Sequence, residues 1–155
     1  MKRILSLILA IVMIVGLASC GATVGEEGDV SIVIENRDGS YTVYKAYLEE
    51  VANKSEGAFG VIQHLMARED NPLTADIVDS DYGAYVNAIG TLVPDTMAGE
   101  FVSVYTSLEK DFGTWDDVAT VDYNGTSLTA SGIGITSMSV ESGTVILFRI
   151  EVYTY

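Results

Sequence analysis

The last run of the chain, Thr144–Tyr153, is the feature that most restricts the possible folds. Its apolar side chains lie on both faces of the expected strand: Ile146, Phe148, Ile150 and Val152 on one, Val145 and Leu147 on the other. A strand that is apolar on both faces is typical of the interior of a sheet, since both faces have to be covered. We therefore expect this strand near the centre of the main sheet.

The earlier part of the chain predicts a hairpin followed by one helix. Alternation at 30–35 and β-forming residues at 41–48 flank the turn Asn36-Arg37-Asp38-Gly39. Ser55 is placed to cap a helix that runs to about Arg68, and Pro72 follows where the helix has to stop. The side chains expected to face the sheet are Phe59, Ile62, Leu65 and Met66.

The rest of the chain is rich in β-formers. Strands are expected at 76–79, 85–89, 101–106, 120–123, 136–140 and 144–153. Asn124-Gly125 is the strongest hairpin-turn signal, because both residues tolerate positive φ. One helix and several strands predict an α+β fold, a β-grasp-like mixed sheet with one main helix.

The N-terminus has the layout of a bacterial lipoprotein signal peptide. Lys2 and Arg3 precede an apolar run of about 15 residues, which is shorter than the ~20 that span a bilayer. The run ends in Leu17-Ala18-Ser19-Cys20, which resembles a lipobox. We expect residues 1–19 to be the signal peptide, Cys20 to carry the lipid, 20–29 to be a flexible tether and 30–155 to be the folded domain. The domain would then sit on the extracytoplasmic face of the cell membrane.

Charge and composition narrow the function classes. The chain has 22 acidic and 8 basic residues, a net charge of −14, so nucleic acid is not an expected partner. Cys20 is the sole cysteine and His64 the sole histidine, so any thiol or imidazole chemistry would depend on these two. We expect His64 to be a surface or boundary residue. No catalytic residue, metal ligand or enzymatic activity is predicted.

Residues 80–90 carry a family resemblance. Ser80-Asp81-Tyr82-Gly83-Ala84-Tyr85-Val86-Asn87-Ala88-Ile89-Gly90 resembles a segment of the transcobalamin C-terminal-like domain family, and the elements of that family follow in similar order over 30–153. The aromatic strand at 101–106 and the Gly-Ile turn at 131–135 are part of this likeness. In the animal members this domain caps one face of cobalamin while a helical domain, which this chain lacks, holds the other.

The resemblance implies a binding module for a small amphipathic ligand, with a corrinoid such as cobalamin the favoured one. The ligand-contacting residues would be Tyr82, Tyr85, Tyr105 and Ile133. From the residues alone, the aromatic side chains could form one amphipathic platform, a set made up of Tyr82, Tyr85, Phe101, Tyr105, Trp115 and Tyr123. The alternative is that these tyrosines are cross-strand pairs at the edge of the core.

Two other functions stay open at this point. The first is an interaction module that docks an envelope transporter, another surface protein or a cell-wall polymer through a sheet edge or an aromatic face. The second is a carboxylate-based hydrolase of envelope glycans, which would need two carboxylates about 5–10 Å apart in a cleft. Trp115-Asp116-Asp117 also resembles the pairing of tryptophan with carboxylates in sugar-binding sites.

Overall fold

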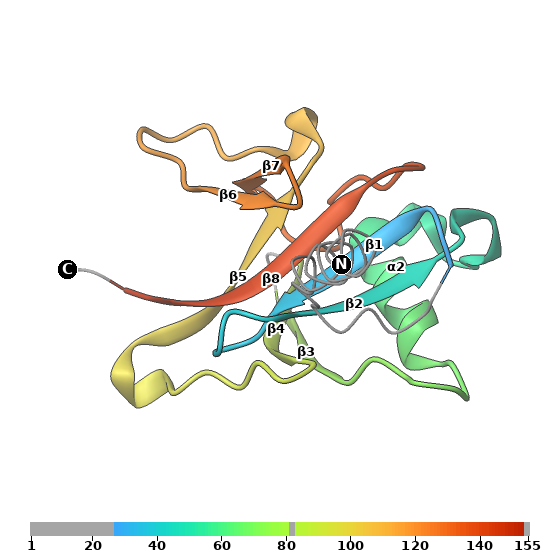
Figure 1. Cartoon of the computed structure of the whole chain (residues 1–155), viewed down its shortest axis with the longest axis horizontal. Helices are drawn as coiled ribbons and strands as arrows, with labels where there is room; N and C mark the ends of the chain where they lie inside the picture. Colours follow the sequence, from blue (N-terminus) through green and yellow to red (C-terminus); the bar gives the residue numbers. More distant parts are fainter. Residues whose placement is uncertain (1–26, 81–82, 154–155) are drawn as a thin grey trace, which may run out of the picture.

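The computed structural model describes residues 27–80 and 83–153, so Cys20 and Tyr82 lie outside the described residues. The main sheet has six strands, in the order β2 (Tyr41–Ala46), β1 (Val30–Glu35), β8 (Val145–Val152), β5 (Glu100–Thr106), β7 (Thr126–Ala130) and β6 (Thr120–Tyr123). β1 and β8 run parallel, and the other neighbours are antiparallel (Figure 1). The sheet is therefore mixed.

Strand β8 lies inside the sheet and is covered on both faces, as the sequence predicts. Ile146 and Phe148 enter the main core on one face, and Leu147 enters a second cluster on the other. All three side chains are fully buried. Burial on both faces explains why this run has almost no polar residue in its first half.

The sheet curls so that its two edge strands meet. Tyr41 of β2 and Tyr123 of β6 form an edge-to-face aromatic pair with ring centroids 5.0 Å apart. The second cluster fills the concave side between them, with Val33, Leu128 and Leu147 at its centre. Curling lets the β6–β7 hairpin cover the face of the sheet that the helix does not.

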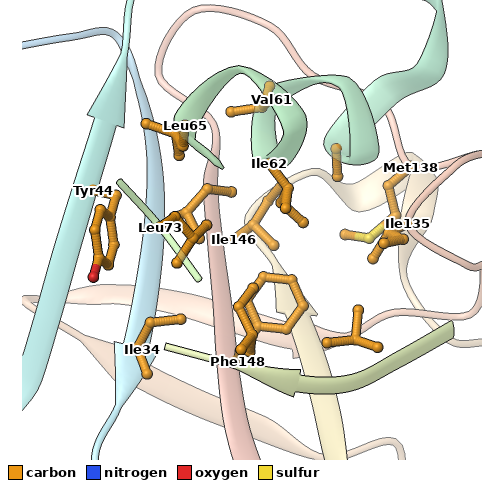
Figure 2. Close-up of a cluster of buried hydrophobic side chains, with 14 of the residues drawn as sticks. Ile34, Tyr44, Val61, Ile62, Leu65, Leu73, Ile135, Met138, Ile146 and Phe148 are labelled. Carbon is orange, nitrogen blue, oxygen red and sulfur yellow. The ribbon is translucent and has the colours of Figure 1, made fainter. Parts of the chain in front are cut away.

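Helix α2 (Gly57–Met66) covers the opposite face. Figure 2 shows Ile62 and Leu65 of α2 pointing toward Ile146 and Phe148 of β8. Ile62 and Leu65 are fully buried, whereas Met66 is 38% exposed and does not face the sheet as predicted. Ala58 and Val61, which were not predicted to face the core, are fully buried, so the packed face of the helix is displaced from the one that the spacing suggests.

The helix also begins differently from the prediction. Ser55 lies in the 3-10 helix η2 (Lys54–Glu56), and no side chain caps α2. Instead, the N–H groups of Ala58 and Phe59 donate to the carbonyl oxygens of Met138 and Ile135. A backbone segment from elsewhere in the chain therefore satisfies the first donors of the helix, a task usually given to a capping side chain.

That same segment was expected to be a strand at 136–140, and this prediction is wrong. The Met138 carbonyl accepts from α2, and the Ser139 N–H donates to the carboxylate of buried Asp111 at 2.7 Å. Backbone groups used in this way are not available for a sheet ladder. The Asn124-Gly125 turn, in contrast, is confirmed, with φ of 51° and 78° between β6 and β7.

A separate two-stranded sheet completes the fold. β3 (Ala75–Ser80) and β4 (Gly83–Ile89) form an antiparallel hairpin whose inner side packs against the main core through Val86 and Ile89. The short 3-10 helices η1 (Leu48–Glu50), η3 (Thr96–Ala98) and η4 (Glu109–Asp111) lie in the connections. The fold is α+β, a curled mixed sheet with one α-helix among the described residues.

Candidate functional site

A small apolar cavity opens between β4 and β5, and we call it the apolar slot. Its volume is about 120 Å³. The lining residues come from three strands and one loop: Ala84, Tyr85 and Val86 of β4, Val102 and Val104 of β5, Phe148 of β8, and Gly134 and Ile135 of the loop. Phe148 is fully buried, so the slot reaches down to the main core.

The slot exists because β4 runs beside β5 without pairing with it. β5 pairs with β8 along its whole length, but on its other side it pairs with β7 only at Tyr105 and Thr106. Beyond these residues, the Val104 carbonyl accepts from the Ser131 N–H at 2.9 Å. The main sheet is thus interrupted on this side of β5, and apolar side chains line the interruption.

The loop after β7 closes one end of the slot. Its backbone is held to α2 by the hydrogen bond from Phe59 to Ile135. Gly83, at the start of β4, has φ of +100°, and a Cβ there would lie 2.7 Å from the Thr136 Oγ1. A side chain at this position would separate β4 from the loop, so glycine permits the close approach.

An aromatic side chain stands at the mouth of the slot. Tyr85 is 49% exposed. Partial burial raises its pKa, and the Tyr153 hydroxyl nearby raises it further, so Tyr85 is a neutral hydrogen-bond donor at physiological pH. Tyr153 stacks on Phe101 with ring centroids 4.3 Å apart. Tyr85 therefore offers a flat apolar ring with a polar hydroxyl edge beside the slot.

The structure brings together some of the predicted ligand-contacting residues and separates others. Tyr85 lines the slot, and Ile133, 38% exposed, directly precedes the lining residue Gly134. Tyr105 lies on the other face of the sheet, is 1% exposed, and donates its hydroxyl to Glu151. Tyr82, like the proposed lipid attachment residue Cys20, lies outside the described residues.

The aromatic residues do not form one platform. Tyr105 and Tyr123 belong to the second cluster, on the side of the sheet away from α2. Trp115 lies on the loop between η4 and β6 and packs against Gly113. These tyrosines are core and cross-strand residues, the alternative that the sequence left open. Phe101 shares the face of β5 with Tyr105, since side chains alternate along a strand, and it stacks on Tyr153.

The sequence did not single out the apolar lining of the slot. Val102 and Val104 alternate as in any half-buried strand, and Phe148 reads as an ordinary core residue. Their role depends on β4 and β5 meeting the loop at Gly134 and Ile135 and strand β8, which lie much later in the chain. The loop could be found from the sequence only through its glycine-isoleucine pattern at 131–135.

Two further hollows lie elsewhere on the surface. A groove of about 580 Å³ runs along the outside of α2 and includes His64, which agrees with its predicted place at the surface or its boundary. A polar hollow of about 330 Å³ contains the bidentate ion pair of Arg37 with Glu100, whose closest atoms are 2.5 Å apart. The Arg37 guanidinium lowers the pKa of Glu100 to about 2. Neither hollow reaches the main core as the apolar slot does.

Two other kinds of feature are absent from residues 27–80 and 83–153. These residues contain no helix long and apolar enough to cross a membrane. The same part of the chain contains no group of three or more histidine, cysteine, aspartate or glutamate side chains placed to hold a metal ion.

Comparison with known proteins identifies a fold and no family. No family model and no curated protein matches the sequence. Among solved structures, the chain is similar to a proposed metal-binding protein from Ruminococcus gnavus, with a TM-score of 0.52 and 10% sequence identity. The similarity covers 83% of this chain and 100% of that one. At this identity, the likeness concerns the fold alone.

Proposed function

We propose that this protein is a non-catalytic binding module that holds a small amphipathic ligand at the apolar slot. The observation that carries the proposal is the slot itself, an apolar cavity that extends from the surface to Phe148 and is bordered by Tyr85. Cavities lined by apolar side chains with a few polar groups at the rim are typical of ligand sites. The hydroxyl of Tyr85 would orient the polar part of the ligand.

The size of the slot limits how the ligand binds. Sites that enclose a drug-sized molecule have volumes of about 300–1,000 Å³, well above the ~120 Å³ of the slot. Only part of a ligand, such as a methyl-bearing edge, would enter. The remainder would lie over Tyr85 and the exposed Ile133. A ligand of which the protein covers only one face fits this geometry.

A corrinoid is the ligand that the family resemblance favours. We infer that the chain has a transcobalamin C-terminal-like domain with a β-grasp-like plan, supported by the helix across one face of a mixed sheet and the parallel pair β1–β8. The resembling segment 80–90 contains all of β4, which forms one wall of the slot. The slot thus coincides with the segment that carries the resemblance.

We further propose that a lipid on Cys20 anchors the module to the outer face of the membrane. The tether from Cys20 to Asp29 has ten residues and would reach up to ~35 Å when extended. The described chain enters the fold where Asp29 donates its N–H to the Ala46 carbonyl at the end of β2. Such a tether leaves the domain free to meet a ligand or an envelope transporter.

Calorimetric titration of the full-length protein in detergent with cyanocobalamin tests the proposal. We expect saturable binding that Tyr85→Ala weakens by about tenfold, because truncating a contacting aromatic ring costs roughly 1–2 kcal/mol. Tyr47→Ala is the matched control, since Tyr47 is a tyrosine of similar exposure, 38%, that is not part of the slot. No heat at high micromolar cobalamin would exclude a corrinoid, and equal weakening by both variants would exclude the slot.

One observation favours a second function, docking of another surface protein. On the outward side of the β3–β4 hairpin, Val78 pairs with Tyr85, and the two side chains are 47% and 49% exposed. Exposed apolar pairs of this kind are common at interaction surfaces. Val78→Asp would then reduce recovery of a partner from envelope extracts and leave cobalamin binding unchanged.

A further inference from the structure

Trp115, the only tryptophan, is held at the surface in an unusual way. Its side chain is 52% exposed, although tryptophan gains most from burial. The six-membered ring of the indole lies directly over Gly113, because a Cβ at that glycine would overlap ring atoms Cη2, Cζ3 and Cε3. One side of the ring is therefore supported by the backbone while much of the rest faces solvent.

The glycine under the ring is explained by the ring and not by backbone conformation. Gly113 has no φ in the left-handed region, so other residues could adopt its backbone conformation. A second glycine, Gly132, lies on Gly113, where its own Cβ would be 3.0 Å from the Gly113 Cα. The missing side chain of Gly113 thus makes room for the Trp115 ring, and the missing side chain of Gly132 lets its loop approach the backbone of Gly113 closely.

This support is fixed to the rest of the fold. The Gly113 N–H donates to the Ala130 carbonyl at the end of β7, at 2.8 Å. The Gly132 N–H donates to the Asp111 carbonyl at 2.9 Å, and the carboxylate of Asp111 accepts from the Ser139 N–H. Hydrogen bonds thus brace Gly113, in the loop that leads from η4 to β6 at the upper left of Figure 1, and Gly132, in the loop after β7. The indole is held ready for a partner, which reduces the entropy lost on binding.

The polar residues beside the ring indicate what the partner is. Asp116 and Asp117 follow Trp115 directly, both are exposed, and Asp117 has a φ of 58°. Within the described part of the chain, neither carboxylate takes part in an ion pair or a side-chain hydrogen bond. Carboxylates only accept hydrogen bonds, so they suit a ligand whose edge carries donors.

We propose that Trp115, with Asp116 and Asp117, forms a binding site for a neutral saccharide. A pyranose ring has one face of C–H groups that can stack on an indole, and hydroxyl groups at its edge that can donate to carboxylates. The net charge of −14 opposes anionic polymers and anionic lipid surfaces, so the saccharide proposed is a neutral one. This site is separate from the apolar slot, which contains none of these residues.

Fluorescence titration tests the site, because Trp115 is the only tryptophan in the chain. Full-length protein is titrated with oligomers of N-acetylglucosamine, glucose and mannose. At least one series should give a saturable shift of the emission maximum. In affinity electrophoresis with the matching polysaccharide, Trp115→Ala should weaken binding by about tenfold and Trp115→Phe by less, since a smaller aromatic ring remains.

Gly113→Ala provides the sharpest variant, because it keeps the tryptophan and displaces its ring. We expect it to bind saccharide as poorly as Trp115→Ala, while Met97→Ala, at an apolar side chain 98% exposed, binds like the wild type. Tyr85→Ala should also bind saccharide normally, which separates this site from the slot. No response to any series, undiminished binding by Trp115→Ala, or a response to phosphatidylglycerol vesicles alone would overturn the proposal.

Discussion

Replacing Tyr105 with phenylalanine would separate a structural role from the ligand-binding role that the sequence suggested. Tyr105 is 1% exposed and lies in the second cluster, and its hydroxyl donates to Glu151. Burial and the hydrogen bond to Glu151 raise the pKa of Tyr105 from 10.0 to about 12. The substitution removes the titrating hydroxyl and keeps the ring that fills the core.

The pKa of Tyr105 determines the direction and the size of the change in stability with pH. Because the pKa in the folded state is above that in the unfolded state, the hydroxyl contributes stability that is fully present below pH 10 and lost as the pH rises through 12. A difference of about two pKa units corresponds to roughly 3 kcal/mol, of which ~1.4 kcal/mol is lost by pH 11. At neutral pH, loss of a hydrogen bond to a charged group costs about 1.5–3 kcal/mol.

Urea unfolding followed by circular dichroism between pH 7 and pH 11.5 measures this difference. We expect the wild type to be more stable than Tyr105→Phe by about 2 kcal/mol at pH 7 and the two to converge near pH 11.5. Tyr47→Phe, at an exposed tyrosine, should change the pH dependence of the free energy of unfolding far less. Parallel curves for wild type and Tyr105→Phe would refute the reasoning. Unchanged binding of ligand by Tyr105→Phe would agree with its place outside the slot.

Two further predictions concern the start of the helix and the polar hollow. Gly57→Ala should destabilise the fold by several kcal/mol in thermal unfolding, because φ is +57° and a Cβ would overlap the Met138 carbonyl oxygen, whereas Gly39→Ala, with φ of +82° and open space around it, should cost only ~1–2 kcal/mol. Equal effects would show that the contact with Met138 is unimportant. Arg37 lowers the pKa of Glu100 to about 2, so this pair contributes stability that is present above pH 4.5 and lost as the pH falls toward 2. Glu100→Gln should therefore flatten the acid side of the stability profile, and an unchanged profile would contradict the assignment.

Elements with strong local signals were predictable, and those that depend on distant partners were not. The Asn124-Gly125 turn and the core strand β8 follow from the residues themselves. The expected strand at 136–140 is instead a loop, because the Met138 carbonyl accepts from an N–H group at the start of α2. Nothing local in that segment reveals this, since the donor comes from a helix some 80 residues earlier in the chain.

The candidate sites divide in the same way. Tyr85 and the Gly-Ile loop were identified from the sequence as parts of the site. Tyr105 is aromatic like Tyr85, but it points to the other face of the sheet. Successive residues of a strand point to opposite faces, so the direction of Tyr105 depends on the register that β5 adopts with β8. The sequence indicates which residues are aromatic, and the pairing decides which of them meet.

The sequence by itself determined the α+β class, the core position of the last strand and the acidic charge that argues against nucleic acid as a partner. These depend on periodicity and composition, which short segments carry on their own. Only the tertiary structure decided that β4 and β5 meet Phe148 and the loop at Gly134 to form the apolar slot, and that Gly132 lies against Gly113, on which Trp115 packs. Both arrangements involve segments that are separated in the chain, and such contacts are fixed by packing of the whole core and not by local preference.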